Sequence, residues 1–224
     1  MDPLVVAGIS ALGIGSVAVA WSLFKDILRW TARKRTAELA ALAASFGFQF
    51  EPTGFSKDAV GFGHLEFFRR GQLISSKNML SAERDGNMVR MFDYEYFLPS
   101  RRGPLGCRPT ICTLEVPVEL PRFWICPENE VTRAVARAGL DDINFPEAPE
   151  FSAKYCIRAA DQEFARRLVD ERMRDFLLRA GDANVEMGRK AILFHLGKKL
   201  PPREFPRLCA LALEFLSLVS EKCK

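Results

Sequence analysis

The chain has 224 residues, of which 48% are hydrophobic and 27% are charged, and this balance predicts a globular body and excludes a disordered chain. The formal net charge is only +4 and the basic doublets are scattered along the sequence. A concentrated basic face, typical of a nucleic-acid-binding domain, is therefore excluded, and we expect no nucleic-acid partner.

The first predicted element is a helix over residues 4–24, a stretch with no charged side chain. A helix of this length rises about 31 Å, which matches the hydrocarbon core of a bilayer. We therefore predict a transmembrane helix, with the lipid bilayer as the partner of residues 4–24. A signal peptide cleaved after Ala18-Val19-Ala20 and a buried core helix are the alternatives, but the start Met-Asp-Pro lacks the positive charge of a signal peptide.

The orientation of this helix follows from the distribution of Lys and Arg, which flank only its C-terminal end. We expect a single-pass protein of the plasma (inner) membrane, with its N-terminus outside and its C-terminal domain in the cytoplasm. The expected membrane-interface residues are Trp21, Lys25, Arg29, Trp30, Arg33, Lys34 and Arg35.

Small residues recur at every fourth position of the same segment, at Ala7, Ala11 and Gly15. This spacing lets two helices approach closely, so self-association through this face is possible. The sequence thus divides into residues 1–30, a membrane anchor with its juxtamembrane segment, and residues 31–224, a cytoplasmic domain.

No Gly or Pro interrupts the chain between Gly15 and Gly47, so the first helix is expected to continue to about Gly47. A short strand is expected next, over residues 46–50. Residues 52–86 have no clean periodicity, and only a turn-rich segment or a small hairpin is expected there.

Alternating patterns then predict antiparallel neighbours within residues 87–99 and 109–121, and a short strand over residues 122–126. In the first strand one face is expected to carry Phe92, Tyr94, Tyr96 and Leu98. In the second strand the side chains expected to point inward are Cys112, Leu114, Val116 and Val118. Further strands are expected over residues 143–146 and 151–159. A hairpin that turns at Gly188-Arg189 completes the expected strands.

Helical periodicity predicts helices over residues 127–139 and 161–181, and a third that follows Pro201-Pro202. The last one has a wide apolar face and is expected to be well buried. The predicted fold class is α+β, with an N-terminal transmembrane helix followed by a mainly antiparallel sheet domain and packed helices, including this buried C-terminal helix.

The sequence contains no recognisable catalytic motif. Its six cysteines lack the spacing of a zinc site and are interpreted as free thiols, so we expect no metal and no cofactor. One polar pair stands out: Asp93 and Glu95 lie two apart in a strand and project from the same face about 7 Å apart, which suits paired acid/base or metal chemistry. The alternative interpretation is a solvated strand face opposite the aromatic residues.

The segments "FFRRG", "FDYEYF", "PRFWICPENE" and "DINFPEAPEFSAKY" together resemble an uncharacterised family of bacterial single-pass membrane-anchored proteins with an aromatic-rich cytoplasmic domain. The resemblance covers roughly residues 36–220 and carries no assigned activity. The expected function is a membrane-tethered, non-enzymatic interaction or scaffold module with an unknown protein partner. The alternative is a membrane-anchored enzyme that uses Asp93 and Glu95, so whether the protein is an enzyme stays open.

Overall fold

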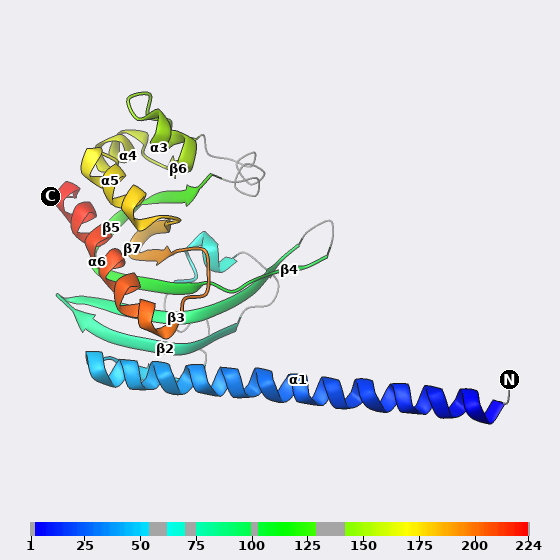
Figure 1. Ribbon diagram of the computed structural model, residues 1–224. Helices are drawn as coiled ribbons and strands as arrows, with labels where there is room; N and C mark the ends of the chain where they lie inside the picture. Colours follow the sequence, from blue (N-terminus) through cyan, green and yellow to red (C-terminus); the bar gives the residue numbers. More distant parts are fainter. Residues whose placement is uncertain (1–2, 54–61, 70–74, 100–102, 129–141, 224) are drawn as a thin grey trace.

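The computed structural model describes residues 3–53, 62–69, 75–99, 103–128 and 142–223, and it describes side chains from residue 21 onwards. Figure 1 shows one long helix beside a sheet. The remaining helices pack over one side and one end of this sheet. The helix expected over residues 127–139 falls almost entirely outside the described residues.

The helices of the described ranges are α1 (Pro3–Phe46), α3 (Pro149–Lys154), α4 (Gln162–Leu168), α5 (Glu171–Ala180) and α6 (Phe205–Lys222), with the 3₁₀ helices η1 (Glu66–Arg69) and η2 (Pro202–Glu204). The strands are β1 (Gln49–Glu51), β2 (Ser75–Arg84), β3 (Asn87–Leu98), β4 (Leu105–Cys107), β5 (Thr110–Pro127), β6 (Tyr155–Ala159) and β7 (Asn184–His195).

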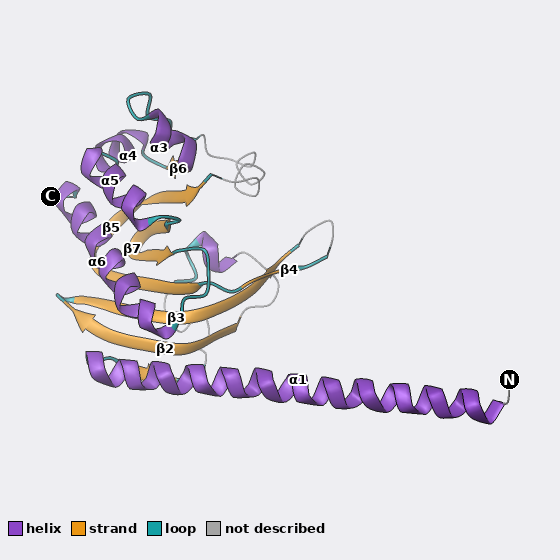
Figure 2. Ribbon diagram, in the orientation of Figure 1, coloured by secondary structure: helices purple, strands orange, loops and turns teal. Residues whose placement is uncertain are grey.

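All strand pairs in the described part of the chain are antiparallel, and the long strand β5 is at the centre (Figure 2). The main path of the sheet is β1-β2-β3-β5-β6, while β4 pairs with β3 and β7 pairs with β5. The first part of β5 pairs with β3 and β7 at once: Cys112 is in register with Met91 on one side and Phe194 on the other. Its last part pairs with β6. The architecture is thus an α+β domain built on an antiparallel sheet.

The two faces of the sheet bury different sets of side chains. The side chains of one face pack with those of α1 and α3–α6 in the main hydrophobic core, in which Leu114 and Phe194 are fully buried. The opposite face is covered by the segment around η1, where Phe67 and Phe68 pack on Phe92 and Tyr94. Strand alternation explains the division, because successive side chains point to opposite faces.

The C-terminal end of α1 belongs to the domain core. Leu39 and Ala43 are fully buried, and α1 contacts β1, β2 and η2. The helix ends where Gly47 adopts a positive φ of 68°, and Phe48 N–H donates to the carbonyl of Ala43 at 2.8 Å. Figure 1 shows the earlier turns of α1 running along the β2 edge and then projecting past the sheet.

In the described part of the chain, no helix combines the length and the apolar character needed to cross a membrane. The predicted transmembrane helix over residues 4–24 is therefore wrong, and with it the single-pass membrane protein and the plasma (inner) membrane location. The apolar stretch is part of a 44-residue helix that continues through the charged residues without a break and ends in the domain core. The boundary predicted between residues 30 and 31 lies inside this helix.

The helix expected over residues 161–181 is two helices, α4 and α5. Asp161 caps α4 by accepting a hydrogen bond from Phe164 N–H at 2.9 Å, and Asp170 caps α5 by accepting from Met173 N–H at 3.0 Å. Asp170 thus starts a second helix, although the helical periodicity of the sequence continues across this position. Arg174 of α5 pairs with Glu147 at 2.9 Å.

Several strand predictions also need correction. Residues 184–195 form one strand rather than a hairpin, and Arg189 has a positive φ of 53° where the register of the β5–β7 pair shifts. Residues 151–159 divide between α3 and β6, and residues 143–146 form no strand. The C-terminal helix α6 is buried as expected, with Phe215 fully inaccessible to solvent.

Candidate functional site

The predicted carboxylate Asp93 lies in a buried ion pair with Arg35 of α1. Arg35 Nε is 2.7 Å from Asp93 Oδ2, and Arg35 Nη2 is 2.6 Å from Oδ1, so the guanidinium binds the carboxylate at two points. The side chains are only 15% and 11% exposed. Asp93 therefore points to the α1 side of the sheet, away from the aromatic residues around η1.

Further donors surround the same carboxylate. Asn78 Nδ2 donates to Oδ2 at 3.0 Å and Thr110 Oγ1 donates to Oδ1 at 3.1 Å, while Lys199 Nζ lies 3.9 Å from Oδ2. The network also extends outwards: Thr36 on α1 donates to the side-chain oxygen of Asn78 at 2.8 Å. It thus connects α1 with β2, β3, β5 and the segment before η2.

The electrostatics of the pair keep Asp93 ionised. Burial alone would raise the pKa of Asp93, but the hydrogen bonds and charge of Arg35, with help from Asn78 and Lys199, hold it below its usual value. Burial lowers the pKa of Lys199, an effect that the charge of Asp93 opposes. A carboxylate with these partners is well suited to holding α1 against the sheet and poorly suited to exchanging protons near neutral pH.

The second predicted carboxylate, Glu95, has a different environment. Its side chain is 34% exposed, and Oε1 accepts from Arg108 Nε at 2.6 Å. The structure therefore places Asp93 in a buried network and Glu95 in a surface ion pair. A catalytic role of the two residues stays a prediction.

Sequence reasoning did not find the partners of Asp93. Arg35 lies 58 positions away and was assigned with its basic neighbours to a membrane interface. Asn78 and Lys199 lie in segments without a readable motif. The available signal was a single Asp in the middle of the strand "NMVRMFDYEYFL", since a charge in a buried strand requires a partner.

The projecting part of α1 has an unusual surface. Its large apolar side chains are about half exposed or more, from 49% for Phe24 to 62% for Trp30. The full set is Trp21, Leu23, Phe24, Ile27, Leu28 and Trp30, which we call the α1 apolar surface. The other predicted interface residues Lys25, Arg29, Arg33 and Lys34 are exposed on the same stretch, whereas Arg35 turns into the body.

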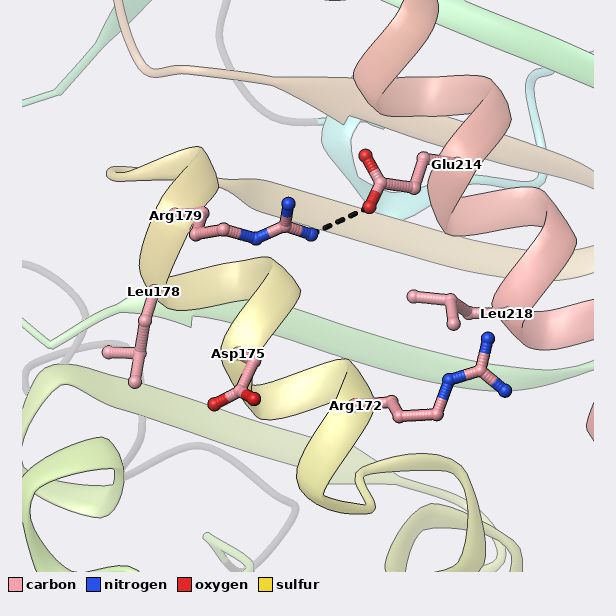
Figure 3. Close-up of a pocket in the computed structure, with 6 residues that line it drawn as sticks. All are labelled: Arg172, Asp175, Leu178, Arg179, Glu214 and Leu218. Carbon is pink, nitrogen blue, oxygen red and sulfur yellow. Dashed lines mark hydrogen bonds and ion pairs between the residues drawn. The ribbon is translucent and has the colours of Figure 1, made fainter.

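A groove of about 520 Å³ separates α5 from α6, and no sequence pattern indicates it. Figure 3 shows Arg179 reaching from α5 towards Glu214 on α6, with Arg172 near Leu218 further along. The Arg179–Glu214 contact is 2.7 Å, and Arg172 forms a second bridge of 2.7 Å with Glu221. These exposed pairs span the groove, and each basic side chain already has an acidic partner.

Comparison with known proteins gives one finding on the fold. No family model and no curated protein matches the chain. The crystal structure of the mycobacterial trehalose monomycolate transport factor A, TtfA, is similar, with a TM-score of 0.57 and 15% sequence identity over 84% of this chain and 95% of that chain. At this identity the likeness shows a shared fold.

Proposed function

We propose that this protein is a non-enzymatic accessory factor that binds a partner protein through the α1 apolar surface, while its α+β body holds α1 in a fixed position. The observation that carries the proposal is the exposure of six large apolar side chains within ten residues of one helix. At about 100° per residue these side chains occupy one half of the helix circumference, and exposed apolar surfaces on folded proteins mark interaction sites.

The residues around the α1 apolar surface favour an acidic partner. Between residues 21 and 34 the exposed charges are four basic side chains and the single acidic Asp26. Lys25 lies 5.5 Å from the ring centre of Trp21, and Lys34 lies 5.4 Å from that of Trp30. A partner that fits this surface would have an apolar groove with an acidic rim.

The body supports this role because α1 is fixed at its other end. Leu39 and Ala43 are buried in the core, and Arg35 is bound at two points by Asp93. A binding segment that is already ordered loses less conformational entropy when it meets its partner. The similarity to a transport factor agrees with an accessory role and extends no further than the fold.

The enzyme alternative receives less support from the same geometry. Both oxygens of Asp93 accept two hydrogen bonds each, from Arg35 and from Asn78 or Thr110. Glu95 is paired with Arg108. Acid/base chemistry requires a group that meets a substrate, and Asp93 instead meets four side chains of its own chain.

The proposal is tested with a photoreactive amino acid at position 27, where the native Ile27 is 59% exposed. The matched control is the same probe at position 118 on β5, where Val118 is 50% exposed. We expect a specific protein adduct from position 27 and none from position 118. Adducts only with lipid, or equal adducts from both positions, would contradict the proposal.

The captured protein is then purified and titrated with the native chain and with the double variant Trp21→Ser/Phe24→Ser, because the rings of Trp21 and Phe24 stack with a centroid distance of 5.9 Å on one side of α1. Because aromatic residues at the centre of an interface commonly contribute about 2 kcal/mol or more each, the double variant should bind at least tenfold more weakly. An adduct between two copies of this chain would identify a second copy as the partner.

A further inference from the structure

We propose that Cys126, Cys156, Glu128 and Asp142 form a binding site for one zinc-class divalent cation where β5 and β6 end. This site is separate from the α1 apolar surface, so the inference does not depend on the proposed function. Three of the four residues place one possible ligand atom each within 4.8 Å of the others, namely the Sγ of Cys156 and a carboxylate oxygen of Glu128 and of Asp142.

The sheet register brings the fourth residue next to Cys156, although its sulfur does not belong to the group of three ligand atoms within 4.8 Å of one another. Cys126 on β5 lies directly opposite Cys156 on β6 in the antiparallel pair. Their side chains are within hydrogen-bonding reach, and Cys126 Sγ also lies 4.0 Å from the carbonyl oxygen of Cys156. Glu128 follows Cys126 by two positions, and Asp142 joins from the segment that packs beside β6.

Backbone hydrogen bonds hold both carboxylate residues near β6. Glu128 N–H donates to the carbonyl of Lys154 at 2.8 Å. Ile157 N–H donates to Asp142 Oδ1 at 2.8 Å, and its carbonyl accepts from Ile143 N–H at the same distance. A hydrogen bond that fixes a ligating carboxylate is a common feature of metal sites, because it orients the ligand before the ion arrives.

The three ligand atoms must move closer together to bind zinc. Zinc binds sulfur at about 2.3 Å and carboxylate oxygen at about 2.0–2.2 Å, so neighbouring ligand atoms in a tetrahedral site lie about 3.5 Å apart. The ligand atoms of Cys156, Glu128 and Asp142 lie within 4.8 Å of one another. Binding therefore requires them to approach by up to about 1.3 Å, and the exposed Asp142 side chain has room to move.

The donor types select the class of ion. Two sulfur and two oxygen donors favour zinc over magnesium or calcium, which prefer oxygen ligands alone. The site combines a buried sulfur, Cys156, with an exposed carboxylate, Asp142, so an ion has a path from solvent. Arg158 lies two residues along β6, and its positive charge favours the thiolate form of Cys156 that binds a metal ion.

The test uses the purified full-length chain, reduced and then dialysed against Zn²⁺. Bound zinc is measured by elemental analysis, and the affinity by competition with a chromophoric chelator. We expect one zinc per chain, and with Co²⁺ in its place a thiolate-to-metal charge-transfer band in the near ultraviolet. Substoichiometric zinc, a cobalt spectrum without that band, or a Cys126–Cys156 disulfide in the freshly isolated protein would each overturn the proposal.

Two variants and one control locate the site. Asp142→Asn retains an oxygen acceptor for Ile157 N–H but removes the charge, and Cys156→Ser removes a sulfur donor. Each should weaken zinc binding about tenfold or more, whereas Cys107→Ser on β4 should leave it unchanged. Should Cys156→Ser fail to fold, Asp142→Asn decides alone, since its exposed side chain is not part of the core.

Zinc should raise the melting temperature of the native chain but not of Asp142→Asn. Equal zinc affinity in all three variants would overturn the assignment.

Discussion

Arg35 on α1 and Asp93 on β3 lie 58 positions apart in the sequence and meet in a two-point ion pair of 2.7 and 2.6 Å. The pair is largely buried and lies on the side of the sheet where the C-terminal end of α1 packs. The way in which α1 is attached to the body therefore depends on a charged contact as well as on apolar packing.

The first prediction concerns the loss of one partner of this pair. Arg35→Met leaves the buried Asp93 without its main counter-charge, and such a change typically costs about 3–5 kcal/mol in the free energy of unfolding. Urea unfolding followed by circular dichroism measures it. The matched control is Lys34→Met, whose side chain is 59% exposed and which should change stability by less than about 0.5 kcal/mol. Equal effects of the two variants would show that the ion pair contributes nothing specific.

The second prediction concerns pH. The pKa of Asp93 is lower in the folded protein than in the unfolded chain, where it is about 3.9. Its stabilising contribution is therefore present above the unfolded pKa and is lost as the pH falls through the folded pKa. The melting temperature should fall on acidification below about pH 5, and Asp93→Asn should show a shallower fall than the native chain. A parallel fall in both would contradict the assignment of the acid-sensitive group to Asp93.

The third prediction concerns the core position of α6. Phe215 is fully buried, with ring centres 6.2 Å from Phe176 and 6.3 Å from Phe194. Phe215→Ala should cost about 3–5 kcal/mol, from the lost transfer free energy and the cavity. Glu214→Ala, one position away, removes only an exposed pair with Arg179 and should cost less than about 1 kcal/mol. Thermal melting of both variants separates the two cases, and melting temperatures that agree would contradict a core role for Phe215.

The fourth prediction concerns the break between α4 and α5. Asp170 accepts from Met173 N–H and also pairs with Lys222 of α6 at 2.6 Å. Asp170→Ala should therefore reduce stability by about 1–2 kcal/mol, mainly through loss of the N-cap. Asp175→Ala, an exposed position in the middle of α5, is the control and should change it by less than about 0.5 kcal/mol. If Asp175→Ala were the more damaging change, the capping explanation of the break would be wrong.

Local patterns of the sequence predicted much of the sheet and the last helix, because alternation and helical periodicity are properties of neighbouring residues. Phe92 and Tyr94 share one face as expected, and α6 follows Pro201-Pro202 as expected. The same reasoning failed at Asp170, where the periodicity continues across a helix boundary, and at Val118, which was expected inward and is exposed.

The candidate sites were harder to predict because their members lie far apart in the sequence. Asp93 was singled out, but its burial depends on Arg35, whose basic neighbours had a separate explanation. The group at the ends of β5 and β6 joins residues 126–128 with residues 142 and 156, and only the strand register brings them together. Long-range pairing of this kind leaves no periodic trace in the sequence.

The continuity of α1 determines how anything bound near its start is placed. From Arg35 back to Pro3 the helix covers 32 steps, so its start lies about 48 Å from the ion pair along the axis. In an α-helix each added residue advances the chain by about 1.5 Å and turns it by about 100°. A single residue inserted between Trp30 and Arg35 would therefore turn the whole α1 apolar surface by more than a quarter of a revolution relative to the sheet, while leaving every contact of the body intact.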